Sequence, residues 1–102
     1  MTEAITLQSV IHIAPGQVSS NLNGELIILN VNTGHYYGLS EVGAHVWQLI
    51  QQPQSVETLW QLLLRAYEVP PEQCRHDLLE LLQNLHDKQL IRVEKNETAA
   101  HA

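Results

Sequence analysis

Among the side chains that bind metals or act as a base or nucleophile, the chain has six histidines and one cysteine, Cys74. The histidines stand at positions 12, 35, 45, 76, 86 and 101, and no two have the four-residue spacing that places two metal ligands on one helical face. His76 and Glu80 have that spacing, but such a pair is more typical of a solvent-exposed contact. The sequence therefore predicts neither a metal site nor a cofactor.

Cys74 has the spacing of a core residue. Together with Leu78, Leu81 and Leu85, it forms one apolar stripe of a predicted helix. A catalytic thiol needs a nearby base and a lowered pKa, and the flanking sequence offers neither. The five glycines are isolated, so no phosphate-binding loop is present. We therefore expect a protein that binds without catalysing a reaction.

The charge is unevenly distributed along the 102 residues, whose net charge is -6. All five bases follow residue 64, and the predicted third helix carries four acids against two bases. Because nucleic-acid binding needs clustered Lys and Arg to neutralise phosphates, this balance argues against DNA binding by that helix.

The chain has the length of one domain, residues 1–102, and no apolar run of membrane-spanning length. It has a single cysteine, and its start lacks the pattern of a signal peptide. We therefore expect one cytoplasmic domain that does not enter a membrane.

Strands are predicted at four places in the first forty residues. Residues 5–13 alternate apolar and polar side chains, as a half-buried strand does. Residues 18–22 and 25–30 flank Asn23-Gly24, a pair typical of a tight hairpin turn. Residues 26–29 are apolar on both faces, which favours a central strand. A return strand is expected at residues 35–39.

Three helices are expected to follow. Ser40 is a predicted cap for a helix over residues 42–50, and Ser55 for one that ends near Val69. Pro71 opens a third helix that extends to about Lys88. Residues 90–93 read as a short strand or extended tail, and residues 96–102 as a flexible terminus. The predicted fold is α+β, with a three-stranded antiparallel sheet followed by three helices.

Three segments together resemble the PqqD family: GHYYGLS at residues 34–40, VGAHVWQL at 42–49 and LHDKQLIRV at 85–93. In that family a tyrosine-rich strand leads into a helix with an Ile-Trp or Val-Trp pair, and a leucine-rich helix ends in a Leu-Ile strand. The resemblance covers residues 18–93. Ser40 and Glu41 stand where an Asn and a variable residue are common in the family.

The resemblance implies a winged helix-turn-helix-like recognition element for ribosomally made, modified peptides. Such an element binds the leader segment of a precursor peptide and presents it to a modifying enzyme. A separate chain of this length resembles the B1 proteins of lasso-peptide pathways, whose partner is a leader peptidase of the B2 type. Two alternatives remain: a peptide chaperone of quinone-cofactor synthesis, and a structural dimerisation module formed through the doubly apolar sheet.

In such elements the leader adds as a strand beside the third strand and contacts the third helix on its other side. Residues 35–39 suit this role because they form a short predicted edge strand without proline. On the helix, a stripe beside the core stripe is the predicted groove wall, and its arginine is placed to pair with an acidic leader residue. Either Tyr36 or Tyr37 could face the groove, and both leucines of the helical stripe could belong to the core. The predicted peptide-binding residues are His35, Tyr36, Tyr37, Gly38, Leu39, Arg75, Leu79, Leu82 and His86.

Overall fold

The computed structural model describes residues 5–23 and 25–95, in which strands precede, separate and follow three helices. The strands form two antiparallel three-stranded sheets with the orders β2-β3-β4 and β5-β1-β6. The elements are β1 (Ser9–Ile13), β2 (Gln17–Leu22), β3 (Glu25–Asn30), β4 (Tyr36–Ser40), α1 (Val42–Leu49), β5 (Gln54–Ser55), α2 (Val56–Ala66), α3 (Pro71–Asp87) and β6 (Ile91–Lys95).

The β2-β3-β4 sheet is the predicted hairpin extended by the predicted return strand. Asn23 has a φ of 52°, which a type I′ turn requires, while Gly24 lies outside the described residues. Leu26 and Ile28 of β3 are buried, and they pair with Leu39 and Tyr37 of β4. The strand that is apolar on both faces is therefore central, as expected.

The second sheet was not expected, and it corrects the predicted arrangement of one sheet followed by three helices. β1 pairs with β6, so that Ile11 lies opposite Val93. It also pairs with the two-residue β5, where Val10 lies opposite Ser55. The α+β class is confirmed. Alternation within residues 5–13 marks a strand, but it does not identify a partner some eighty residues away.

The helices begin and end near the predicted residues, with two corrections. Ser55 caps α2, because its side-chain oxygen accepts the backbone N–H of Thr58 at 3.1 Å. The residue before α1 is Glu41, which has a φ of 44° and makes no side-chain capping bond. Ser40 ends β4 and is not the cap. α2 ends at Ala66, earlier than expected, since its C-cap Tyr67 is already extended.

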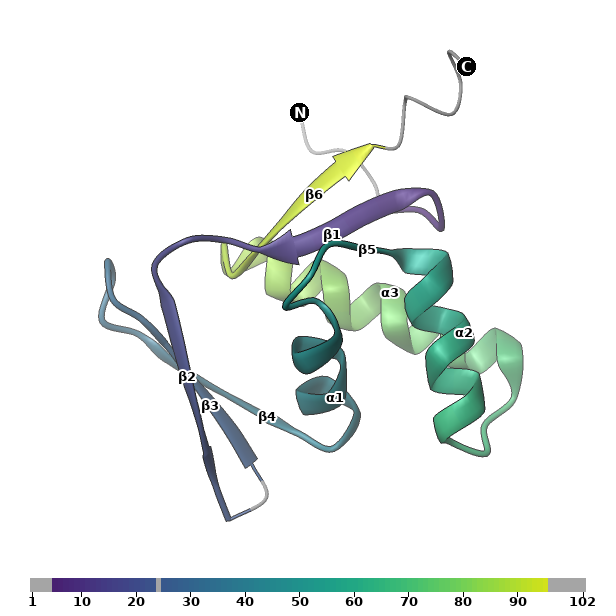
Figure 1. Ribbon diagram of the computed structural model, residues 1–102, viewed down its shortest axis with the longest axis horizontal. Coiled ribbons are helices and arrows are strands. Elements are labelled where there is room, and N and C mark those ends of the chain that lie inside the picture. Colours follow the sequence, from purple (N-terminus) through teal and green to yellow (C-terminus); the bar gives the residue numbers. More distant parts are fainter. Residues whose placement is uncertain (1–4, 24, 96–102) are drawn as a thin grey trace.

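The helices and both sheets share one core. Figure 1 shows β1, β5 and β6 along one side of the helices, with the β2-β3-β4 sheet at one end and α3 running behind α1. Trp47 of α1, Leu59 of α2 and Leu82 of α3 are almost fully buried, together with Ile11 and Ile28 from the two sheets. Within the described residues, no helix has the length and apolar character needed to span a membrane.

Candidate functional site

β4 is an edge strand whose two faces differ. Tyr37 and Leu39 are half-buried and lie on the face that joins the core, beside the buried residues of β3. Tyr36 points to the opposite face, because neighbouring strand residues alternate, and its exposed fraction is 71%. Tyr37 therefore faces the core and Tyr36 faces outward.

Among the described residues, no strand pairs with the outer edge of β4. The N–H of Asn30 donates to the carbonyl oxygen of His35 at 3.0 Å, so this pair is hydrogen-bonded toward β3. Antiparallel pairs alternate between hydrogen-bonded and non-bonded positions, so Tyr37 and Leu39 also direct their peptide groups toward β3. The peptide groups of Tyr36, Gly38 and Ser40 therefore point away from the sheet, where another strand could pair with them.

An apolar cavity of about 380 Å³ lies between the start of α1, the end of α2 and one flank of α3. One of its walls is held by a contact between Tyr67 and His45, in which the hydroxyl lies 3.3 Å from Nδ1. Because Val42 and Gly43 directly follow β4, the cavity lies near the end of that strand. The lining residues are Val42, Gly43, Leu63, Tyr67, Val69, Pro70, Gln73, Cys74, Asp77, Leu78 and Leu81.

One side of α3 is directed at both the cavity and β4. Gln73, Asp77 and Leu81 follow one another at four-residue spacing and line the cavity. Lys88, the C-cap residue of the helix, continues this row seven residues after Leu81. Its Nζ lies 5.3 Å from the centre of the Tyr37 ring, a cation-π distance. This contact fixes the end of α3 beside β4.

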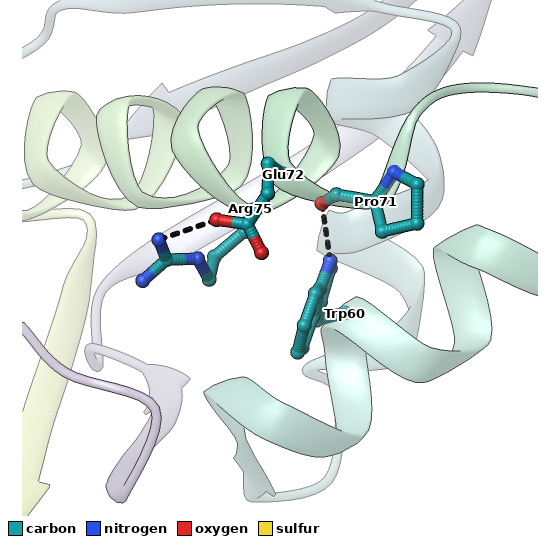
Figure 2. Close-up of polar contacts among 4 residues, drawn as sticks. All are labelled: Trp60, Pro71, Glu72 and Arg75. Carbon is teal, nitrogen blue, oxygen red and sulfur yellow. Dashed lines mark hydrogen bonds and ion pairs between the residues drawn. The ribbon is translucent and has the colours of Figure 1, made fainter.

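The predicted groove residue Arg75 lies on a different side of α3. Its guanidinium binds Glu72 of the same helix, with 2.7 Å between Nη2 and Oε1. Figure 2 shows Arg75 folded back toward Glu72, on the side where Trp60 of α2 donates a 2.9 Å hydrogen bond to the carbonyl of Pro71. Arg75 does not line the cavity.

The other three predicted helical residues also lie away from the cavity. Leu82 is fully buried in the core and Leu79 packs half-buried against it, the arrangement of the alternative in which both leucines belong to the core. His86 lines a second, polar cavity of about 390 Å³, which Gln17 also lines. Buried His86 Nδ1 and Gln17 Oε1 have no hydrogen-bond partner among the described residues. None of the four predicted helical residues therefore lines the apolar cavity.

The charge of the apolar cavity comes from one carboxylate, Asp77. Burial raises the pKa of the Cys74 thiol above its ordinary value, and the negative charge of Asp77 raises it further. The thiol is therefore protonated at neutral pH, which suits a packing residue and not a nucleophile. Among the described residues, no three His, Cys, Asp or Glu side chains gather where they could hold a metal ion.

The candidate residues that sequence reasoning did not name are Gln73, Asp77, Leu81 and Lys88. Leu81 was assigned to the core and Leu82 to the groove, and their burial is the reverse: Leu82 is fully buried and Leu81 half-buried. The sequence signal that could have found them is their common side of the predicted third helix, along a row that ends in Lys88. It could not be distinguished from the predicted row that starts at Arg75, because both rows combine leucine with polar residues and flank the same core stripe.

Comparison with known proteins gives one family and two solved structures. The family described as "Coenzyme PQQ synthesis protein D (PqqD)" matches residues 25–91. "TbiB1 in Complex with the TbiA(beta) Leader Peptide" is 28% identical and superposes with a TM-score of 0.74 over 79% of this chain and 94% of that one. "Lasso peptide synthetase B1 complexed with the leader peptide" is 20% identical, with a TM-score of 0.73 over 80% and 96%, and supports the fold alone. No curated protein matches the chain in sequence.

Proposed function

Because the chain belongs to the PqqD family, we propose that it binds the leader segment of a ribosomally made precursor peptide in lasso-peptide biosynthesis. The leader adds to β4 as a fourth strand of the β2-β3-β4 sheet. One observation carries the proposal: among the described residues no strand pairs with the outer edge of β4, and β4 ends two residues before Val42, which lines an apolar cavity together with one flank of α3. The leader-bound state of the 28% identical relative supports it.

The backbone of β4 supplies affinity that does not depend on the peptide sequence. Tyr36, Gly38 and Ser40 each offer an N–H and a C=O to the added strand. Each hydrogen bond contributes about 0.5 to 1.5 kcal/mol after the exchange with water. This sum must offset the ordering of the peptide and the loss of its free motion.

Side-chain pockets supply the selectivity. An apolar leader residue that enters the cavity beside Leu81 contributes about 1.5 to 3 kcal/mol by burial. Among the predicted strand residues, the side chains of His35, Tyr37 and Leu39 lie on the inner face of the β2-β3-β4 sheet. Those of Tyr36 and Gly38 lie on its outer face. On α3 the proposed contacts are Gln73, Asp77 and Leu81, in place of the predicted row at Arg75.

We propose that the whole chain is one cytoplasmic recognition domain. The single core that joins residues 5–91 supports one domain. The cytoplasm is where the ribosome makes the precursor and where the lone thiol of Cys74 stays reduced. In this proposal α2 and α3 form a helix-turn-helix pair, with β1 and β6 as the wing.

The domain itself is proposed to be non-catalytic and to present the leader to a peptidase of the B2 type or another modifying enzyme. A quinone-cofactor chaperone remains the second candidate because the family description names that pathway. The two candidates differ in the peptide they bind. Leader segments from the two pathways, offered together, would distinguish them.

The experiment is a titration of leader peptides with amide hydrogen exchange as the structural readout. A displayed set of natural lasso leader segments, including TbiA(beta), is selected on the full chain, and the bound segments are measured by anisotropy. We expect saturable binding, with the amides of Tyr36 and Gly38 protected from exchange. The amide of Tyr37 already pairs with β3 and serves as the internal control.

The matched variants are Tyr36→Pro and Tyr36→Ala. Proline removes an outward N–H and is tolerated at a strand edge, so this variant should fold and lose affinity, whereas the alanine variant keeps the donor. If no leader segment binds, or if Tyr36→Pro binds as well as Tyr36→Ala does, strand addition at β4 is wrong. A tight dimer without leader affinity would favour the dimerisation alternative.

A further inference from the structure

The polar cavity of about 390 Å³ lies apart from the proposed leader site. Among the described residues, it shares no lining residue with the apolar cavity. The two cavities lie on different sides of α3, because His86 lines the polar one, while Lys88, about 200° further round the helix, contacts Tyr37 of β4. A peptide strand on β4 therefore does not fill the polar cavity.

Two turns and the end of α3 form the walls of the polar cavity. The turn after β1 is joined to the turn after β3, because the N–H of Val31 donates to the carbonyl of Gly16 at 2.9 Å. A Cβ at Gly16 would approach Nδ2 of Asn32 within 2.6 Å, so the two turns are in close contact. Figure 1 shows both turns on the side of the molecule where α3 passes into β6. The fold itself thus holds the walls in place.

Two buried polar atoms of this cavity need a partner. Gln17 uses its amide nitrogen to donate to the carbonyl of Pro15 at 3.2 Å, so its Oε1 remains and can only accept. This oxygen and Nδ1 of His86 are buried, and neither has a hydrogen-bond partner among the described residues. A buried polar atom without a partner is costly, and native proteins pair nearly all of them. Gln17 therefore requires a group that donates a hydrogen bond inside the cavity.

Asn30 offers the cavity a donor. It is 6% exposed, and it lines the cavity beside Gln17, with which it pairs across β2 and β3. Its Oδ1 accepts the backbone N–H groups of Asn32 and Thr33 at 2.9 and 3.2 Å, respectively. These two bonds fix the orientation of the amide. Its nitrogen is therefore the atom left to donate to a bound group.

Arg92 gives the cavity a positive charge. It lines the cavity, is exposed to solvent, and makes no ion pair with a described residue. Glu94, two residues further along β6, pairs instead with His12 of β1, at 2.9 Å between Oε2 and Nε2. None of the described lining residues is Asp or Glu. The cavity therefore favours an anionic group that also carries a hydrogen-bond donor.

We propose that the polar cavity binds an acidic residue of a polypeptide segment other than the one on β4. The carboxylate of this Asp or Glu accepts from Arg92, from the amide of Asn30 and from the N–H tautomer of His86. The backbone N–H of the same residue donates to Oε1 of Gln17. The cavity volume is within the range of roughly 300 to 1,000 Å³ that ligand sites have, and it far exceeds the share of about 30 Å³ that one water takes.

Other anions match the cavity less well. Sulfate only accepts hydrogen bonds, so it would leave Oε1 of Gln17 unpaired and repel it. A free amino acid would bring a charged ammonium close to Arg92, whereas the N–H of a peptide bond is neutral. The inference does not depend on leader binding at β4. It adds a second attachment point, through which the domain holds another acidic segment while β4 is occupied.

The test is an NMR titration of the full chain with blocked amino acids. The probes are the N-acetyl N-methylamide derivatives of aspartate and glutamate, and the readout is the side-chain amide signals of Gln17 and Asn30. We expect saturable shifts with both probes. The blocked asparagine derivative should bind about two- to fivefold more weakly, the range of one exposed ion pair. An added leader segment should leave the affinity for the probes unchanged.

Three variants test the assigned contacts. Gln17→Met keeps the length of the side chain and removes Oε1, so it should lower probe affinity by roughly tenfold, as expected for a hydrogen bond to a buried acceptor whose loss leaves a donor unpaired. It should melt close to the unchanged chain, because it also removes an unpaired buried oxygen. Arg92→Gln should lower affinity by about two- to fivefold. Arg65→Gln makes the same charge change on α2, away from both cavities, and should have no effect.

The inference is overturned if neither blocked acid gives saturable shifts, or if a folded Gln17→Met binds them as tightly as the unchanged chain. Sulfate that binds as tightly as the blocked acids would reduce the cavity to an unselective anion patch. Free aspartate that binds more tightly than its blocked form would assign the cavity to a small molecule and not to a polypeptide. A chain that binds the probes but no leader segment overturns the proposed function and leaves this inference intact.

Discussion

At the residue scale, adjacent leucines of α3 have different tasks. Leu82 has no exposed surface and contacts the shared core, whereas Leu81 is half-buried and lines the cavity. The helix turns about 100° between neighbours, so one step along the chain moves a side chain from the core to the cavity wall. The sequence predicted that α3 carries a core stripe and a binding flank. It could not determine which flank faces β4, since that depends on how α3 crosses the sheet.

Substitutions at these two positions should separate stability from binding. Leu82→Ala should lower the free energy of unfolding by about 2 to 5 kcal/mol, because it leaves a cavity in the core. Leu81→Ser should lower it less, and should weaken leader binding in a protein that remains folded. Urea unfolding and peptide anisotropy on both variants measure the two effects. Equal affinity of Leu81→Ser and the unchanged chain would remove Leu81 from the binding surface.

At the scale of elements, the strands of the meander and the three helices could be predicted, and the β5-β1-β6 sheet could not. The β2-β3 hairpin is local, because an Asn-Gly turn joins strands that pair next to one another. β6 instead is the last strand in the sequence and pairs with the first strand, β1. β5 has only two residues and gives no periodic signal. Non-local pairing of short strands depends on tertiary packing, which a single sequence does not encode in any local pattern.

The second sheet should be essential for folding. Ending the chain after Gln89 removes Leu90 and the whole of β6, which begins with Ile91. Leu90 and Ile91 are 0% and 2% exposed. Losing the burial of these two side chains costs about 3 to 6 kcal/mol, a large share of the roughly 5 to 15 kcal/mol that stabilises a typical domain. We expect the shortened chain to lose its cooperative thermal transition in circular dichroism.

A chain that ends at Lys95 is the control for shortening as such. It keeps all of β6 and should melt like the full chain. A cooperative transition at an unchanged temperature in the chain that ends at Gln89 would contradict the structural role of β6.

At the scale of the whole molecule, the proposed site connects parts that are distant in sequence. β4 supplies the edge, the start of α1 and the end of α2 complete the cavity, and Lys88 holds the end of α3 against Tyr37. A bound peptide would contact all of these elements at once. Because they share one core, binding should stabilise the entire fold and not a single loop.

A saturating leader should therefore raise the melting temperature. At one hundred times the dissociation constant, a ligand specific for the folded state adds about 2.7 kcal/mol. For a domain of this size, that corresponds to an increase of roughly 10 to 20 °C. Differential scanning fluorimetry with the leader and with a scrambled peptide measures the shift. An identical curve with both peptides would contradict specific binding to the folded chain.

The free edge of β4 also has a consequence for the protein before it meets its peptide. An unpaired strand edge without proline or a charged side chain is a template for pairing between copies, which is how sheet proteins aggregate. The net charge of -6 keeps copies apart, although salt screens this repulsion. A strand that occupies the edge removes the template itself. The bound leader would thus also act as a solubility factor for its own receptor.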